Sequence, residues 1–243
     1  MSGKRLSAHP PYTYRDYKSS ILRGPARDPV DLGELEAKQS SGAGVESRAS
    51  LAGRFRPGEL DHDLTRNARR GGEPLGERIV VSGRVLDESG SPVPDALIEI
   101  WQANAGGRYL HKADDHDAPI DPNFLGAGRN VTDREGRYRF LTIQPGAYPW
   151  KNHHNAWRPR HIHFSVIGES LAGRLVTQMY FPGDPLLDLD PIFHAVPAAA
   201  RGRLIAHFDL GLTQPEFALG YHFDIVVAGS GATPRDDHGS GAG

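Results

Sequence analysis

Two histidines stand two residues apart in the segment RPRHIHFSV, whose apolar and β-branched residues are typical of a strand. Side chains at positions i and i+2 of a strand share one face, with Cα atoms about 6.5–7 Å apart. The imidazoles of His161 and His163 can therefore converge on one metal ion. A pair of surface histidines on a strand is the plainer interpretation, and the spacing alone does not decide between the two.

Aromatic and basic residues surround this histidine pair. The run YPWKNHHNAWRPRHIH places Tyr148, Trp150 and Arg158 just before it. Such a cluster between strands suits a pocket for an aromatic substrate, although aromatic residues also line the edge of a core. The nearest acidic residues along the chain are Glu135 and Glu169, so an iron(II) site with two histidines and one carboxylate is poorly supplied.

Phenolate oxygen is the anionic ligand that this neighbourhood offers, from Tyr148 and from Tyr109 in GGRYLH. A free tyrosine has a pKa of about 10, so only a strong Lewis acid deprotonates it at neutral pH. Two phenolates and two imidazoles favour ferric iron, because the hard anions stabilise Fe(III) over Fe(II). A catechol could then bind as a dianion by displacing one phenolate and a bound hydroxide, which would take its two protons.

The amino-acid composition excludes several classes of site and of binding partner. Cysteine is absent, which excludes a disulfide framework, sulfur-ligated metals and a thiol nucleophile. The 28 basic and 30 acidic residues give a net charge of -2, which does not support nucleic-acid or membrane-surface binding. The start of the chain has basic residues without an apolar stretch after them, and no apolar run approaches the roughly 20 residues that span a bilayer. We therefore expect a soluble, cytoplasmic protein.

The elements that must position these side chains are mostly short strands. The chain has 29 Gly and 19 Pro spread along it, which favours turns between strands over long helices. The segments RIVVSGRVLD and DALIEIWQA flank a turn cluster and predict a β-hairpin. A short helix is expected within residues 191–204, interrupted at Pro197. Further strands are predicted at residues 137–143, 160–168, 175–181, 206–212 and 221–229.

This pattern predicts a mainly β protein, an antiparallel β-sandwich with an extended N-terminal arm. The arm covers residues 1–75 and is expected to pack on its own domain or on a partner chain, because it carries tyrosines and aliphatic residues despite its weak periodicity. Residues 76–229 form the catalytic sandwich. Residues 230–243 are expected to be a flexible C-terminal tail.

Long segments of the chain resemble the intradiol ring-cleavage dioxygenases. The resemblance runs from about Tyr14 to about Val227, and the arm contributes to it with YKSSILRGP. A run of the form Y-P-W followed by W-R-P-x-H-I-H is long and specific. The matching segments are GRYLH, GAGRNVTDREGRYRFLTIQPGAYPWKNHHNAWRPRHIHFSVIG and QMYFPGDPLLDLDPIF.

The resemblance implies an Fe(3+) cofactor with four protein ligands. Tyr109, Tyr148, His161 and His163 stand at the ligand positions of the family. Tyr148 and His163 would be the axial ligands, and Tyr109 and His161 the equatorial ones. Tyr148 would be the ligand that the substrate displaces.

The resemblance also assigns residues that act on the substrate. Arg158 matches an arginine whose charge would stabilise the carbanion that develops on the ring. Trp150 and Gln178 match positions that line the pocket. Tyr17 matches a tyrosine of the arm near the substrate carboxylate.

The reaction implied is the opening of protocatechuate (3,4-dihydroxybenzoate) by O2 to 3-carboxy-cis,cis-muconate, a step of aromatic catabolism in the β-ketoadipate pathway. The resemblance implies an assembly of α and β chains, in which only the β chain carries the iron ligands, and the intact set here indicates a β chain. One alternative is a relative that opens catechol or hydroxyquinol, but residues 1–75 lack the helical periodicity of its N-terminal region. A second alternative, a non-catalytic transthyretin-like binding domain, fits residues 83–101 alone.

Overall fold

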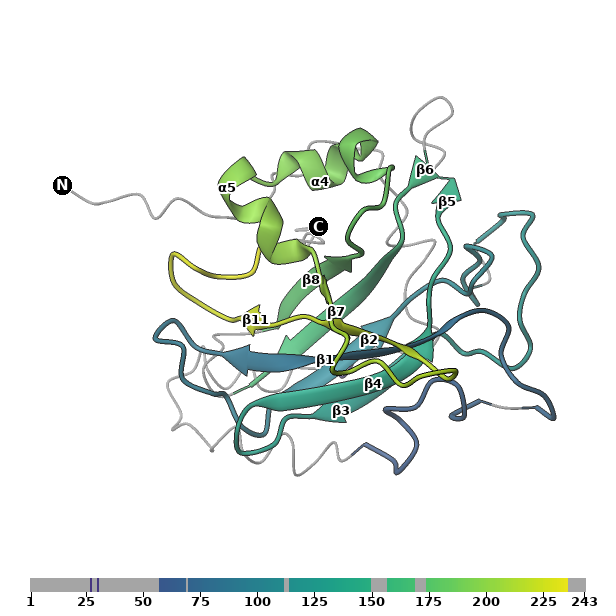
Figure 1. The fold of residues 1–243 in the computed structure, drawn as a ribbon, viewed down its shortest axis with the longest axis horizontal. Helices are drawn as coiled ribbons and strands as arrows, with labels where there is room; N and C mark the ends of the chain where they lie inside the picture. Colours follow the sequence, from purple (N-terminus) through teal and green to yellow (C-terminus); the bar gives the residue numbers. More distant parts are fainter. Residues whose placement is uncertain are drawn as a thin grey trace, which may run out of the picture.

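Two β-sheets packed face to face form the body of the molecule (Figure 1). The computed structural model describes residues 27, 30, 57–68, 70–111, 114–149, 157–168 and 174–235. Within this part of the chain, strands greatly outnumber helical turns. The prediction of a mainly β sandwich is therefore confirmed.

The first sheet is built around its long strand β1. Its members are β1 (Arg78–Leu86), β4 (Arg137–Ile143), β9 (His207–Phe208), β10 (Leu219–His222) and β11 (Ile225–Val226). Strand β1 pairs antiparallel with β4 along its length, and it pairs in parallel with β10 and β11. The antiparallel pattern expected from the sequence thus holds for the β1–β4 ladder, while the C-terminal strands add parallel pairs.

The second sheet is antiparallel throughout and has the order β3-β2-β7-β8. Its members are β2 (Leu97–Trp101), β3 (Ala127–Val131), β7 (His161–Ile167) and β8 (Leu175–Tyr180). A separate two-stranded ladder pairs β5 (Tyr148–Pro149) with β6 (Trp157–Arg158).

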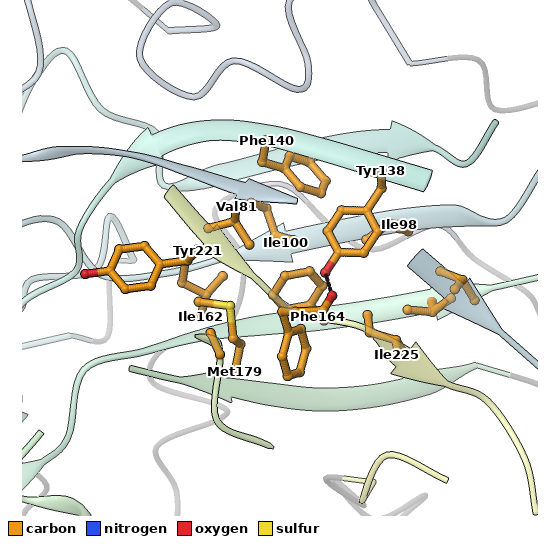
Figure 2. Packing of buried hydrophobic residues seen from close by; sticks show 14 of the residues in the cluster. Val81, Ile98, Ile100, Tyr138, Phe140, Ile162, Phe164, Met179, Tyr221 and Ile225 are labelled. Carbon is orange, nitrogen blue, oxygen red and sulfur yellow. Dashed lines mark hydrogen bonds between the residues drawn. The ribbon is translucent and has the colours of Figure 1, made fainter. Parts of the chain in front are cut away.

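Side chains from both sheets interdigitate in one apolar core. Figure 2 shows Val81 and Phe140 of the first sheet facing Ile100, Ile162 and Phe164 of the second. These residues are at most 1% exposed, which is the burial that the alternating pattern predicts for one face of each strand. The core therefore fixes which face of β7 is turned away from it.

The prediction that residues 78–87 and 95–103 form a β-hairpin is wrong. Strands β1 and β2 lie in different sheets, although a turn does follow β1. The returning chain makes only one bridge, between Pro92 and Leu86, before it crosses to the second sheet. Pro92 and Pro94 flank this return and have no N–H to donate, so the ladder cannot continue.

Two short helices follow β8. The helix α4 (Pro191–Ala195) is separated by Pro197 from α5 (Ala198–Arg201), as the sequence predicts. Single 3-10 turns lie before and after them, η1 (Leu187–Leu189) and η2 (Gly202–Leu204). None of the helices in the described residues is long and apolar enough to cross a membrane.

Part of the predicted arm lies against the sandwich. Leu64 inserts into the core and donates its backbone N–H to the carbonyl of Leu141 at 2.8 Å. Farther back, the backbone N–H of Val30 donates to the buried carboxylate of Glu99 at 3.1 Å. Most of residues 1–56 and all of 236–243 lie outside the described residues, so the division at residues 75 and 229 stays a prediction.

Candidate metal centre

Strand β7 turns His161 and His163 away from the core. Ile162 and Phe164, which alternate with them, belong to the core cluster. Both imidazoles are buried, and their ring centroids lie 4.8 Å apart. The same-face arrangement expected from the spacing is therefore present.

The hydrogen bonding of His161 indicates which of its ring nitrogens would bind a metal. Its Nδ1 lies 2.7 Å from the carbonyl oxygen of Pro159, which can only accept, so Nδ1 carries the proton. The Nε2 atom is then the lone-pair nitrogen, and it lies 3.4 Å from the Tyr148 hydroxyl. A backbone carbonyl that fixes the tautomer is the usual support for a metal-binding histidine.

Tyr109 reaches the same place from the loop after β2. Its ring lies edge-on to that of Tyr148, with centroids 5.5 Å apart, and 6.4 Å from the ring of His163. The backbone N–H of Tyr109 donates to the buried Asp114 carboxylate at 2.9 Å, which holds this part of the loop. Two phenols and two imidazoles thus gather from three separate segments of the chain.

The loops that carry the two tyrosines touch through a glycine. Gly107 has φ +80°, and a Cβ atom there would lie 2.1 Å from the carbonyl oxygen of Ala147. The neighbouring backbone N–H of Gly146 donates to the carbonyl of Asn104 at 2.9 Å. This close approach brings Tyr109 and Tyr148 together, and no residue with a side chain fits at position 107.

The donor set fits a hard trivalent metal ion. Among the described residues, no group of three or more His, Cys, Asp or Glu side chains could hold a metal. A metal bound at the four gathered rings must therefore use tyrosine oxygen beside the two histidine nitrogens. Two phenolates supply two negative charges in a buried place, which suits Fe(III) better than a divalent ion.

The sheet register places further side chains around the histidines. Trp101 of β2 lies opposite His163, and their rings stack at 4.8 Å with an angle of 2° between planes. On the other side, β8 places Gln178 opposite His163 and Tyr180 opposite His161. Both neighbours of β7 thus help to shape the site.

Arg158 lies fully buried beside this cluster. Strand β6 carries it, and its guanidinium Nη2 donates to the Gln178 side-chain oxygen at 2.7 Å and to the Tyr180 hydroxyl at 2.8 Å. The same group forms an ion pair with the buried carboxylate of Asp190 at 3.1 Å. A permanent positive charge is thereby held next to the gathered phenols and imidazoles.

Some site residues fall outside what the structure describes or were missed by sequence reasoning. Tyr17 and Trp150 lie outside the described residues. Tyr180 is buried in an apolar cluster, and its hydroxyl contacts the guanidinium of Arg158. Asp190 was not singled out, although an Asp immediately before a Pro is a signal for a helix start, which is what it forms here.

Comparisons with known proteins place the chain in a family. A family model described as "Dioxygenase" matches residues 52–229, and one described as "Protocatechuate 3,4-dioxygenase beta subunit N terminal" matches residues 3–32. The chain belongs to the intradiol dioxygenase family, as its sequence motifs indicate.

The chain is also similar to individual proteins of this family. The chain is 61% identical over 229 residues to the protocatechuate 3,4-dioxygenase beta chain of Burkholderia cepacia, covering 94% of each. It is 29% identical over 161 residues to the alpha chain from the same organism, covering 65% of this chain and 76% of that one. Among solved structures, 3-chlorocatechol 1,2-dioxygenase from Rhodococcus opacus 1CP matches with a TM-score of 0.53 and 26% identity, over 71% of this chain and 68% of that one.

Proposed function

We propose that the chain acts as the β chain of a protocatechuate 3,4-dioxygenase, which opens the ring of protocatechuate with O2 to 3-carboxy-cis,cis-muconate. The observation that carries this proposal is the burial of two phenols and two imidazoles in one cluster beside a buried guanidinium. Identity of 61% over nearly the whole of a protocatechuate 3,4-dioxygenase beta chain supports the substrate.

Tyr109, Tyr148, His161 and His163 would hold Fe(3+) in this proposal. When bound, the iron would make a chelated catecholate reactive toward O2. The Tyr148 oxygen would also serve as the base that takes one of the two catechol protons when the substrate binds.

Arg158 would stabilise the negative charge that develops on the ring. Its guanidinium lies in the protein interior, where a fixed charge acts more strongly than in water. Tyr17, Trp150 and Gln178 would line the substrate pocket. Of these, Gln178 contacts the Arg158 guanidinium at 2.7 Å, so it would act partly through that arginine.

We also propose an α chain as the partner. The relative that covers 94% of this chain is itself named as a β chain, and an α chain from the same organism is similar over 65% of this chain. The predicted arm is the segment proposed to contact it.

The test is O2 uptake by the iron-loaded protein, co-expressed with a protocatechuate 3,4-dioxygenase α chain. Protocatechuate and catechol are offered in parallel, with the metal-free protein as the control. We expect one O2 consumed per protocatechuate, faster turnover than with catechol, and a burgundy-red colour from phenolate-to-iron charge transfer. A colourless protein after iron loading would refute the metal site, and faster turnover of catechol would refute the substrate.

A further inference from the structure

Both oxygens of Asp190 are engaged, and they serve two different elements. Oδ2 accepts from Nε and Nη2 of Arg158 at 3.2 and 3.1 Å. Oδ1 accepts from the backbone N–H of Ile192 at 3.2 Å, which makes Asp190 the N-cap of α4. One buried carboxylate thus joins the β6 arginine to the start of a helix.

The helix that Asp190 caps reaches the candidate metal centre. Ile192, in its first turn, packs against the apolar cluster that contains Trp101, Tyr109 and Tyr148. In Figure 1, α4 and the β5–β6 ladder lie on the same side of the sandwich, at the top of the view. Asp190 therefore sets the position of the guanidinium relative to a wall of the site.

The other two acceptors of Arg158, Gln178 and Tyr180, also restrict its orientation. The Tyr180 hydroxyl can donate to the Gln178 side-chain oxygen at 3.0 Å or to Oδ2 of Asp190 at 3.4 Å, and both Tyr180 and Gln178 accept from Nη2. Arg158 and Asp190 are both 0% exposed in their side chains, so solvent does not screen their interaction. A long, flexible arginine is thereby held in one orientation along its Nε and Nη2 edge.

We propose that Asp190 is a positioning residue for catalysis, which holds the Arg158 guanidinium where charge develops on the substrate. The inference rests on the proposed role of Arg158. Preorganised charge is effective only at the right place, and a misplacement of about 1 Å can cost about 100-fold in rate. The competing explanation is that the pair contributes to folding alone.

The experiment measures kcat and KM for protocatechuate in the iron-loaded α–β complex. Asp190→Asn keeps an N-cap for α4 but removes the charge that orients Arg158. Asp184→Asn is the matched control, because Asp184 is also buried, also caps a turn and also accepts from an arginine, Arg160, at 3.1 Å. Thermal unfolding and the phenolate-to-iron absorption band are recorded for each variant.

We expect Asp190→Asn to lower kcat about 10- to 100-fold, with KM and the absorption band nearly unchanged. Asp184→Asn is expected to lower the unfolding temperature without this loss of kcat. An Asp190→Asn variant with wild-type kcat, or with a loss no larger than that of the control, would overturn the inference. If Asp190→Asn does not fold, Asp190→Glu, which keeps the charge but shifts it by one methylene, is judged by the same criteria.

A double-mutant cycle separates positioning from folding. In an Arg158→Gln background, Asp190→Asn is expected to lower kcat less than about 2-fold further, because Asp190 acts through the arginine. Equal loss of kcat in both backgrounds would contradict positioning. If Arg158→Gln itself retains full activity, the proposed role of Arg158 fails, and the role of Asp190 that rests on it fails too. A wild-type complex that leaves protocatechuate intact counts against the proposed function.

Discussion

Tyr148 and Arg158 lie directly opposite each other in the two-stranded ladder of β5 and β6. The phenol that is proposed to take a catechol proton and the cation that is proposed to stabilise the ring therefore share one small element. The residues that contact this pair lie on two longer strands. Nε2 of His161 on β7 lies 3.4 Å from the Tyr148 hydroxyl, and the side-chain oxygen of Gln178 on β8 accepts from Arg158. These side-chain contacts join the short ladder to β7 and β8 of the larger sheet.

Replacing Arg158 with serine tests the division of roles within this pair. The change is expected to reduce kcat about 100- to 1000-fold while the iron content and the visible absorption band stay near wild type. It also leaves the buried Asp190 carboxylate without the guanidinium, which is expected to lower the free energy of unfolding by about 3–5 kcal/mol. Steady-state kinetics, metal analysis and urea unfolding measure the three quantities. Unchanged turnover would remove Arg158 from the mechanism.

Loss of a proposed ligand is expected to weaken iron binding. Tyr109→Phe removes only the hydroxyl, and His161→Ala removes the ring whose Nε2 faces Tyr148. Both variants are expected to retain less iron after dialysis against a chelator and to lose or shift the phenolate-to-iron absorption band. Tyr138→Phe is the matched control, since Tyr138 is buried in the main core and donates to the Phe223 carbonyl. Full iron retention by Tyr109→Phe would exclude that phenol as a ligand.

Gly107→Ala is expected to disturb both tyrosine loops. A Cβ atom at this position would lie 2.1 Å from the Ala147 carbonyl oxygen, and the φ of +80° is unfavourable for alanine. The free energy of unfolding is expected to fall by at least about 2 kcal/mol, with weaker iron retention. Gly202→Ala is the control, because nothing lies within 4 Å of a Cβ there and the φ is -58°. Urea unfolding of both variants checks the prediction, and equal stabilities would contradict it.

Features that are set by local pattern could be predicted from the sequence. The alternation in β7 places His161 and His163 on the face away from Ile162, because a strand has a fixed period of two. Pro197 interrupts the short helix as expected, because it cannot donate to the preceding turn. These features depend on a few consecutive residues.

Contacts between distant segments of the chain could not be predicted from local pattern. Strands β1 and β2 look like a hairpin in sequence, but side-chain pattern does not say which sheet a strand joins. The Arg158–Asp190 pair joins residues 32 positions apart, and no local period links them. The role of Tyr180 depends on the register between β7 and β8, which aligns it with His161 only in the folded sheet.

Alkaline pH is expected to destabilise the sandwich through Tyr138. Burial raises the pKa of this phenol well above its ordinary value near 10, and the negative charge of Asp224 raises it further. Its hydroxyl donates to the Phe223 carbonyl at 2.5 Å, and a dashed line from Tyr138 marks this hydrogen bond in Figure 2. The folded protein therefore keeps the proton at a pH where the unfolded chain has lost it.

The sign of the effect follows from this difference. The contribution of Tyr138 to stability is complete below about pH 10 and is lost as the pH rises toward the folded-state pKa, by up to about 1.4 kcal/mol per pH unit. Tyr138→Phe is expected to cost about 1–3 kcal/mol at pH 7 through loss of the hydrogen bond, and to make the decline above pH 10 shallower. Urea unfolding between pH 7 and pH 11 measures both effects. An equally steep alkaline decline in wild type and variant would show that other groups, such as Tyr221 with its pKa also raised by burial, dominate instead.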